Sequence, residues 1–317
     1  MDVAVALLNT LVFPGFLFLF NAGFFFSWVD RKLLARFQER VGPPVFQPWA
    51  DFFKLLSKEI IIARTAFKAT FILAPLISLI AVMLVPLMLP IVTPTPQFTF
   101  IGDLIVIVYL LILPALAAMI GGSASGNPYG SIGSSREMML LTSYELPFII
   151  AVFTVALKAG SLRIVDLVQY QSSNGFLFLT GSGFIAFLVM LLSLQAKLSV
   201  PPFDIPDAKT EIIAGPYTEY SGALLALFKL SHAMLLFVLP WFLCTLFFGG
   251  VLVDFSSTIR LFVTSAASVL KLLILLIAMS LIRCINPRAR IDQALRFFWL
   301  HLTIIASVGF GLAVVGW

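Results

Sequence analysis

Long apolar stretches alternate with short polar segments along the whole chain of 317 residues. Each stretch holds about 20 residues, the length of an α-helix that crosses the hydrocarbon core of a bilayer. Pro201-Pro202 cannot continue a helix and Asn286-Pro287 is typical of a turn, so both mark helix ends. The pattern predicts an all-α polytopic membrane protein with about eight transmembrane helices, at roughly 5–29, 67–90, 103–122, 140–158, 178–198, 221–248, 259–283 and 296–316. We expect them to form a single integral membrane domain over residues 1–317.

One polar segment, residues 47–63, has a helical period of its own. In QPWADFFKLLSKEIIIA the apolar residues Trp49, Phe52 and Phe53 recur among Asp51 and Lys54 at helical spacing. This predicts an amphipathic helix on the cytoplasmic interface of the membrane. The alternative is a solvated connector that carries some apolar side chains.

The composition excludes a soluble catalytic domain. Hydrophobic residues make up 61% of the chain and charged residues 11%, whereas a soluble domain carries about a quarter charged residues. The only cysteines, Cys244 and Cys284, and the only histidines, His232 and His301, lack the spacing of a metal site or a disulfide framework. We therefore expect no cofactor and no metal on this chain. The start, MDVAVALLNT, has no basic segment, so we expect its apolar stretch to be a retained span.

Basic residues predict the orientation in the membrane. Three of the 20 lysines and arginines, Lys158, Arg163 and Arg260, fall on one side of the predicted spans, and Lys229 and Lys271 fall inside them. The other side holds Arg31, Lys32, Arg36, Arg40, Lys54, Lys58, Arg64, Lys68, Arg136, Lys197, Lys209, Arg283, Arg288, Arg290 and Arg296. The crowded side is expected to be cytoplasmic, with both termini outside a multi-pass protein of the plasma membrane. This topology accounts for the net charge of +5 without a nucleic-acid partner.

Three charged residues lie well inside predicted spans: Glu145, Lys229 and Lys271. Each costs about 3 kcal/mol to insert, so such residues face the bundle interior and often mark ion or proton pathways. The alternative is that partners satisfy them and they only determine helix packing. Glu137 precedes Glu145 by eight residues, about 12 Å along a helix and about 80° around it. The two acids can form a relay only if another helix contributes a group between them.

A loop between the fifth and sixth spans, residues 199–220, carries an unusual density of acids: Asp204, Asp207, Glu211 and Glu219. Pro206 suits a first helical position, and a short helix from there would place Asp207 and Glu211 on one face. Like charges at that distance raise one another's pKa, as a proton-accepting cluster requires. An ordinary charged cytoplasmic loop is the alternative.

Five segments, in order, resemble one family, the membrane subunit at the heel of respiratory complex I and its relatives in membrane-bound NiFe hydrogenases and sulfane reductases. They are VDRKLLARFQERVGP (29–43), ADFFKLLSKE (50–59), IGSSREMMLLTSYE, PPFDIPDAKTEIIAGPYTEYSG (201–222) and LKLLILLIAMSLIRCINPRARIDQ (270–293). The resemblance covers most of the chain.

This resemblance implies a subunit without its own cofactor that couples a soluble redox arm to antiporter-like membrane subunits. The implied partners are hydrogenase-like large and small subunits and an iron–sulfur subunit on the cytoplasmic face, carrying iron–sulfur clusters and a NiFe centre, together with lipid. The charge pathway would comprise Glu137, Glu145, Asp204, Asp207, Glu211, Glu219, Lys229 and Lys271. Docking of the redox arm would use Asp30, Arg31, Arg36, Arg40, Arg136, Arg283 and Arg290.

Details of the motifs favour the hydrogenase branch, fed by ferredoxin. The segment GPPVFQPWAD is shorter than its quinone-enzyme counterpart, and GNPYGSIGSSRE carries Glu137 where quinone enzymes tend to have alanine. One departure is Lys209, which takes a position where the family has an acid and could neutralise its neighbours. Two alternatives stay open: the quinone-binding subunit of a complex I-like NADH or ferredoxin:quinone oxidoreductase, and a stand-alone secondary ion transporter.

Overall fold

The computed structural model describes residues 10–91, 99–251 and 258–316. Within these ranges the chain is helical and contains no strand, which confirms the all-α fold. The helices are α2 (Phe16–Phe37), α3 (Gln47–Leu56), α4 (Lys68–Met88), α5 (Asp103–Ala124), α6 (Pro128–Ala159), α7 (Ile164–Asn174), η1 (Leu177–Leu179), α8 (Gly181–Lys197), α9 (Lys209–Ile212), η2 (Gly215–Tyr217), α10 (Gly222–Phe247), α11 (Thr258–Ile285), α12 (Ile291–Arg296), the π-helical turn η3 (Phe297–Leu302) and α13 (Thr303–Val315).

Six stretches of the described chain are long and apolar enough to cross a membrane: α4, α5, α6, α10, residues 262–285 of α11, and the continuous helix from α12 to α13. Helix α8 is apolar but has only 17 residues. Helix α2 has 22 residues, yet Asp30, Arg31, Lys32 and Arg36 occupy its second half. The first predicted span begins among residues outside the described ranges, and α2 itself begins at Phe16.

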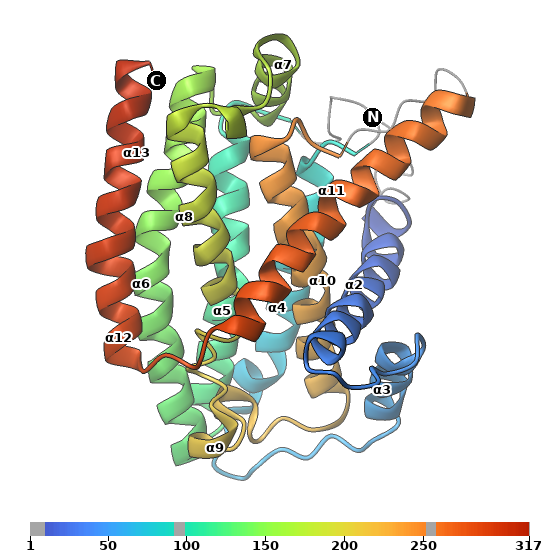
Figure 1. Ribbon diagram of the computed structural model, residues 1–317. Coiled ribbons are helices and arrows are strands. Elements are labelled where there is room, and N and C mark those ends of the chain that lie inside the picture. The colour runs from blue at the N-terminus through green and yellow to red at the C-terminus, as the bar shows by residue number, and fades with distance from the viewer. Residues whose placement is uncertain (1–9, 92–98, 252–257, 317) are drawn as a thin grey trace.

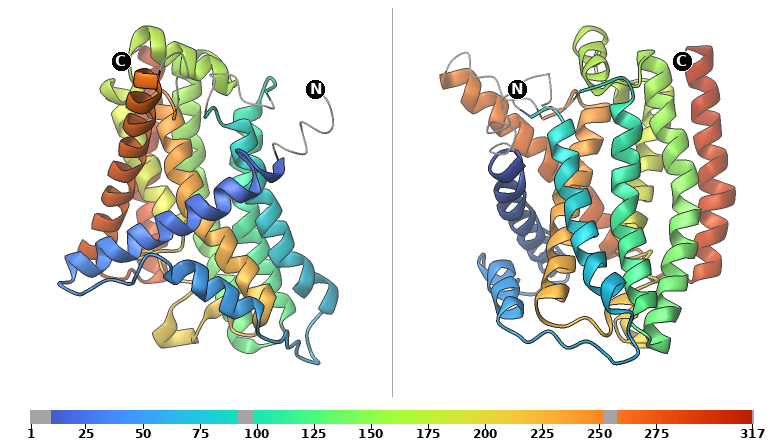
Figure 2. Two further views of the ribbon diagram at one scale, coloured as in Figure 1. Left: turned by 90° about the vertical axis from the view of Figure 1, so that its right-hand side faces the viewer. Right: turned by 180° about the vertical axis from the view of Figure 1, so that it is seen from behind.

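The helices form a bundle around α10, which packs against α2, α3, α4 and α11. Helices α4, α5, α6, α8 and α13 run roughly parallel to α10, whereas α11 crosses the bundle diagonally (Figure 1). Helix α2 is also strongly inclined (Figure 2). One end of the bundle carries α3, α9 and α12, and the opposite end carries α7 (Figure 1). We call these the basic end and the opposite end, because the loops of the first hold most of the lysines and arginines.

The expected interfacial helix corresponds to α3, which ends at Leu56. One face of α3 packs on α2, because the rings of Trp49 and Phe52 contact the ring of Phe24, at centroid distances of 5.7 and 5.5 Å. Phe53 is 59% exposed on another face. Residues 57–67 continue without helix, and the Ile61 N–H donates to the hydroxyl of Ser221, at the start of α10, at 2.9 Å. Helix α3 therefore packs on α2, and the segment that follows it is bonded to the start of α10.

Candidate functional site

The acidic loop, residues 199–220, folds back against α5 and α6 through contacts between small residues. A Cβ added at Gly133 of α6 would lie 2.6 Å from the Cα of Gly215, and one at Gly122 of α5 would lie 2.8 Å from the Cα of Pro216. Gly215 has a φ of +52°, a left-handed conformation that disfavours other residues. These glycines let the backbone of the loop lie directly on the two helices.

This contact brings a group of acids together at the basic end of α6. Glu137 is buried, with 5% of the residue exposed, and the Ser199 hydroxyl donates to its carboxylate at 3.4 Å. Tyr217 is affected by the same acids. Burial raises the pKa of its phenol well above the usual range, and the charges of Asp207 and Glu137 raise it further. The phenol therefore stays protonated and can donate a hydrogen bond. We call Glu137, Asp207 and Tyr217 the lower cluster.

A second buried group lies further along α6. The Lys197 Nζ is 3.3 Å from the Glu145 carboxylate, and the two side chains are 1% and 12% exposed. The ammonium also lies 4.1 Å from the centre of the Phe148 ring, within cation–π distance. Among the described residues, neither the ammonium, the Glu145 carboxylate nor the Tyr144 hydroxyl beside them has an aligned hydrogen bond. The pair is therefore held by charge and by ring contacts more than by directed hydrogen bonds.

One short segment joins these two groups. Lys197, the last residue of α8, pairs with Glu145, and Ser199, two residues later, bonds Glu137. Glu137 and Glu145 alone are about 12 Å apart along their helix. The end of α8 therefore supplies the intervening groups that α6 lacks.

Lys197 is not among the predicted site residues, because it falls with the bases on the side expected to be cytoplasmic. It is in fact buried, at 5% exposed. The available signal was its position, since Leu198 and Val200 continue the apolar stretch before Pro201-Pro202. A lysine inside an apolar stretch needs an acid nearby, and Glu145 is that acid.

The remaining acids of the loop each have a different partner, away from the lower cluster. Glu211 forms an ion pair with Arg136 at 2.6 Å and is 60% exposed, and Asp204 pairs with Arg288 at 2.8 Å. Glu219 accepts a hydrogen bond from Asn127, at the turn between α5 and α6. The expected helix from Pro206 is wrong, because α9 covers only Lys209–Ile212. Asp207 therefore does not share a helical face with Glu211, and the Lys209 side chain lies outside the described ones.

Lys271 lies apart from the lower cluster and from the Glu145–Lys197 pair. Its ammonium donates to the backbone carbonyls of Phe248 at 2.9 Å and Gly250 at 3.4 Å, just beyond α10. Gln171 of α7 donates to the carbonyls of Thr245 and Leu246 there, at 3.1 and 3.0 Å. Helix ends leave carbonyls unpaired, and these two side chains satisfy several of them. In this structure Lys271 caps α10 at the opposite end of the bundle.

Lys229 and His232 share one exposed face of α10, three residues apart, in a helix that is otherwise mostly buried. The charges of Arg31 in α2 and Arg283 in α11 act on His232, and α10 packs against both of these helices. The Glu145–Lys197 pair, by contrast, joins α6 to α8. Lys229 and His232 therefore belong to the α2 side of the bundle.

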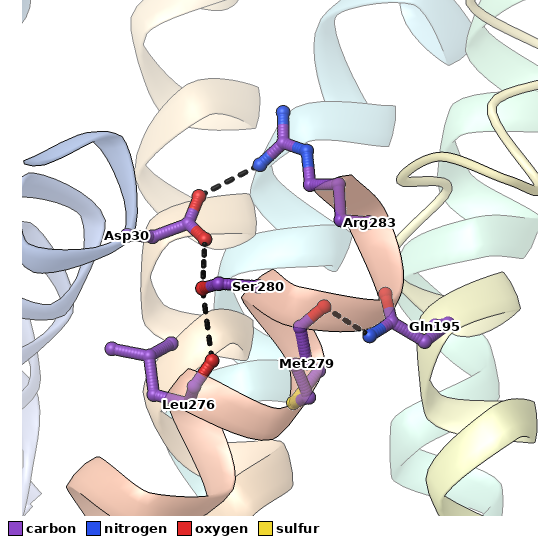
Figure 3. Close-up of polar contacts among 6 residues, drawn as sticks. All are labelled: Asp30, Gln195, Leu276, Met279, Ser280 and Arg283. Carbon is purple, nitrogen blue, oxygen red and sulfur yellow. Dashed lines mark hydrogen bonds and ion pairs between the residues drawn. The ribbon is translucent and has the colours of Figure 1, made fainter. Parts of the chain in front are cut away.

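The predicted docking residues divide into buried and exposed ones. Asp30 is 8% exposed, and its carboxylate accepts hydrogen bonds from Ser280 at 2.9 Å and from Arg283 at 2.7 Å (Figure 3). From α8, Gln195 donates to the Met279 carbonyl at 2.8 Å (Figure 3). These contacts tie α2, α8 and α11 together, so the Asp30 carboxylate faces α11 and is not at the surface.

The other docking candidates are accessible. Arg31 pairs with Asp51 of α3 at 3.1 Å, with side chains 46% and 41% exposed. Arg36, Arg40 and Arg290 are exposed, and Arg136 is half-buried. Together they leave a basic surface at the end that carries the acidic loop. Within the described ranges, no three His, Cys, Asp or Glu residues gather as a metal site would need.

Comparison with known proteins gives matches over nearly the whole chain. A family model described as NADH dehydrogenase matches residues 9–314. The chain is 35% identical over 319 residues to NADH-quinone oxidoreductase subunit 8 of Thermus thermophilus, covering 96% of this chain and 85% of that relative. It is 34% identical over 327 residues to an NADH-quinone oxidoreductase subunit of Carboxydothermus hydrogenoformans, covering 98% and 90%.

A solved structure also matches the fold. A chain of the membrane-bound sulfane sulfur reductase, an archaeal respiratory membrane complex, superposes with a TM-score of 0.88 at 29% identity. The match covers 98% of this chain and 100% of that one. These similarities confirm the resemblance drawn from the sequence motifs.

Proposed function

Because this chain belongs to the NADH dehydrogenase family, as a homologue of NADH-quinone oxidoreductase subunits, we propose that it is the membrane-anchor and energy-coupling subunit of an ion-pumping respiratory complex. A soluble redox arm docks on its basic end, and antiporter-like membrane subunits beside it move the ions. The redox cofactors lie on the arm, and this chain binds the arm, responds to its charge and passes that change into the membrane.

The observation that carries this proposal is the junction made by the end of α8 between the lower cluster and the Glu145–Lys197 pair. Charge introduced near the acidic loop acts first on Asp207 and on Glu137, which is buried where charges interact strongly. A proton taken up at Glu137 lies next to Ser199, two residues from Lys197. A change in the charge of Glu145 alters the attraction that holds Lys197 in place, so each step changes the electrostatic balance of the next.

Three features support a complex of the membrane-bound hydrogenase and sulfane reductase type, fed by ferredoxin. The segment GPPVFQPWAD is short, and Glu137, which quinone enzymes tend to replace with alanine, is at the centre of the lower cluster. The superposition on the sulfane sulfur reductase chain covers nearly all of both molecules. The arm would then consist of hydrogenase-like large and small subunits and an iron–sulfur subunit.

A second candidate is the quinone-binding subunit of a complex I-like enzyme. It is favoured by the 35% identity to an NADH-quinone oxidoreductase subunit and by the polar face of α10 that Lys229 and His232 present towards α2. A stand-alone transporter is disfavoured, because relatives over nearly the whole length are named as subunits of oxidoreductases.

Affinity purification from membranes in mild detergent, with quantification of nickel and iron and identification of the co-purifying chains, tests the proposal. Iron–sulfur and antiporter-like chains that co-purify support the coupling role, and nickel identifies the hydrogenase type. Without nickel, assays with reduced ferredoxin and either polysulfide or a quinone separate the sulfane reductase from the quinone enzyme. A chain that purifies alone and free of metal overturns the proposal.

A further inference from the structure

Two apolar hollows lie on either side of Phe153, at the end of α6 that is opposite the acidic loop. The larger, of about 880 Å³, lies between α6 and α13 and is lined by Ile150, Leu157 and Phe310 among others. The smaller, of about 90 Å³, lies between α5 and α6 and is lined by Val108 and Ile149 among others. Phe153 and Leu162 line both hollows, so the two hollows adjoin at these side chains.

The hollows open on the outer surface of spanning helices. Phe153 is 42% exposed, and its neighbours Leu157 and Tyr109 are 42% and 65% exposed. The polar groups at the larger hollow are already satisfied within the chain, since Ser161 donates to Asp166 and Ser307 donates to the Thr303 carbonyl. The space therefore suits hydrocarbon and offers little to a polar ligand.

A basic residue follows directly after one of the residues that both hollows share. Leu162, which lines each of them, is followed by Arg163, whose guanidinium donates to the Thr99 hydroxyl at 3.2 and 2.7 Å. A guanidinium has five N–H donors, so others stay available to a phosphate oxygen. The nearest acids are engaged: Asp103 is fully buried and accepts from the Ile164 N–H, and Asp166 accepts from Ser161.

We propose that the two hollows bind the two hydrocarbon chains of one membrane phospholipid, which straddles Phe153 and places its phosphate group at Arg163. Two adjacent apolar hollows, with a cation on the residue that follows their shared Leu162, match a molecule with two chains and one anionic group. Helices α6 and α13, which carry the larger hollow, lie side by side at the edge of the bundle (Figures 1 and 2). The lipid would cover the hollows between α5, α6 and α13 at the level of Phe153.

The test uses the complex purified from its membranes and placed in phosphatidylcholine nanodiscs doped with a photoreactive phosphatidylglycerol that carries a diazirine in one acyl chain. After illumination, cross-linked residues are mapped by mass spectrometry. We expect about fivefold more cross-linking at the hollow-lining residues than at the equally exposed apolar face of α4 around Ile72, Leu76 and Ile80, as one favourable basic contact near the membrane surface implies. A diacylglycerol with the same photoreactive chain should show little of this preference.

Variants distinguish a specific phosphate site from non-specific binding of lipid. Arg163→Gln should lower the phosphatidylglycerol cross-linking at the hollows to the diacylglycerol level, whereas Arg260→Gln, which removes a base from the same end of the bundle, should leave it unchanged. Equal labelling of the hollows and of α4, or equal effects of the two variants, would overturn the proposal. Mapping of the unmodified complex decides the question even if Arg163→Gln fails to assemble.

Discussion

Lys197, the last residue of α8, lies 3.3 Å from the carboxylate of Glu145 in α6, and its side chain is 1% exposed. This contact joins two helices through opposite charges in a part of the protein from which water is largely excluded. It also orients the next residues of the chain, so that the Ser199 hydroxyl bonds Glu137, eight residues before Glu145 in α6. The ion pair is thus a packing contact and a step in the proposed relay at once.

Glu145→Gln should separate electron transfer from ion pumping. We expect pumping by reconstituted vesicles to fall by about tenfold or more, because an amide cannot carry a proton along a path marked by intramembrane acids. Electron transfer within the soluble arm should persist. Pumping and acceptor reduction are measured on the same vesicles, with Glu59→Gln, an exposed acid, as the control. Undiminished pumping by Glu145→Gln would remove Glu145 from the pathway.

Loss of one partner of the buried pair should cost more stability than loss of both. Lys197→Met leaves an uncompensated buried carboxylate, for which we expect about 3–5 kcal/mol of destabilisation, and Glu145→Leu leaves an uncompensated ammonium. The double variant should recover most of this loss. Thermal unfolding of the detergent-purified complex measures all three. Additive losses in the double variant would show that the two charges do not depend on one another.

Gly133→Val should displace the acidic loop from α6. A Cβ at Gly133 would meet the Cα of Gly215 at 2.6 Å, so the loop backbone must move, with an expected cost of about 1–3 kcal/mol. Hydrogen exchange of residues 203–217 should become faster. Gly311→Ala is the matched control, because a Cβ there meets no atom within 4 Å in the described part of the chain. Unchanged exchange in Gly133→Val would contradict close packing of the loop.

Asp30→Asn should weaken the bundle without weakening attachment of the redox arm. The carboxylate bonds Ser280 and Arg283 of α11, and loss of a charged hydrogen bond costs about 1.5–3 kcal/mol. We expect a lower unfolding temperature and unchanged co-purification of the arm. The reverse result, with normal stability and lost co-purification, would place Asp30 in the docking surface after all.

Arg36→Glu combined with Arg40→Glu should disturb docking of the redox arm. Both side chains are exposed at the basic end, and like-charge contacts across an interface oppose association. The amount of arm that co-purifies should fall, and the loss should be larger at low salt, because fewer ions then screen the repulsion. Arg260→Glu, at the opposite end, should have no effect. A double variant that keeps its arm in full would show that the redox arm does not dock on the surface around Arg36 and Arg40.

Much of the architecture follows from the sequence because the bilayer restricts the choices. Backbone groups within the hydrocarbon must be paired, so apolar stretches of the length of α4, α5 and α10 have to be helices. The ordered motifs around Arg36, Glu137 and Asp207 likewise indicated the family, since they are local patterns that need no knowledge of tertiary contacts.

The partners of the charged residues could not be read from the sequence, because they depend on where distant helices end and how they are inclined. Lys197 pairs with Glu145 because α8 stops short inside the bundle, and Asp30 pairs with Arg283 because α11 crosses α2 diagonally. Lys271 meets the end of α10 through the same inclination of α11. The apolar pattern thus predicts that charges lie within membrane-spanning helices and must be satisfied there. Only the packing of the helices decided which opposite charge or carbonyl satisfies each one, since a buried ionic group is stabilised by neighbours at hydrogen-bond distance and not by neighbours in sequence.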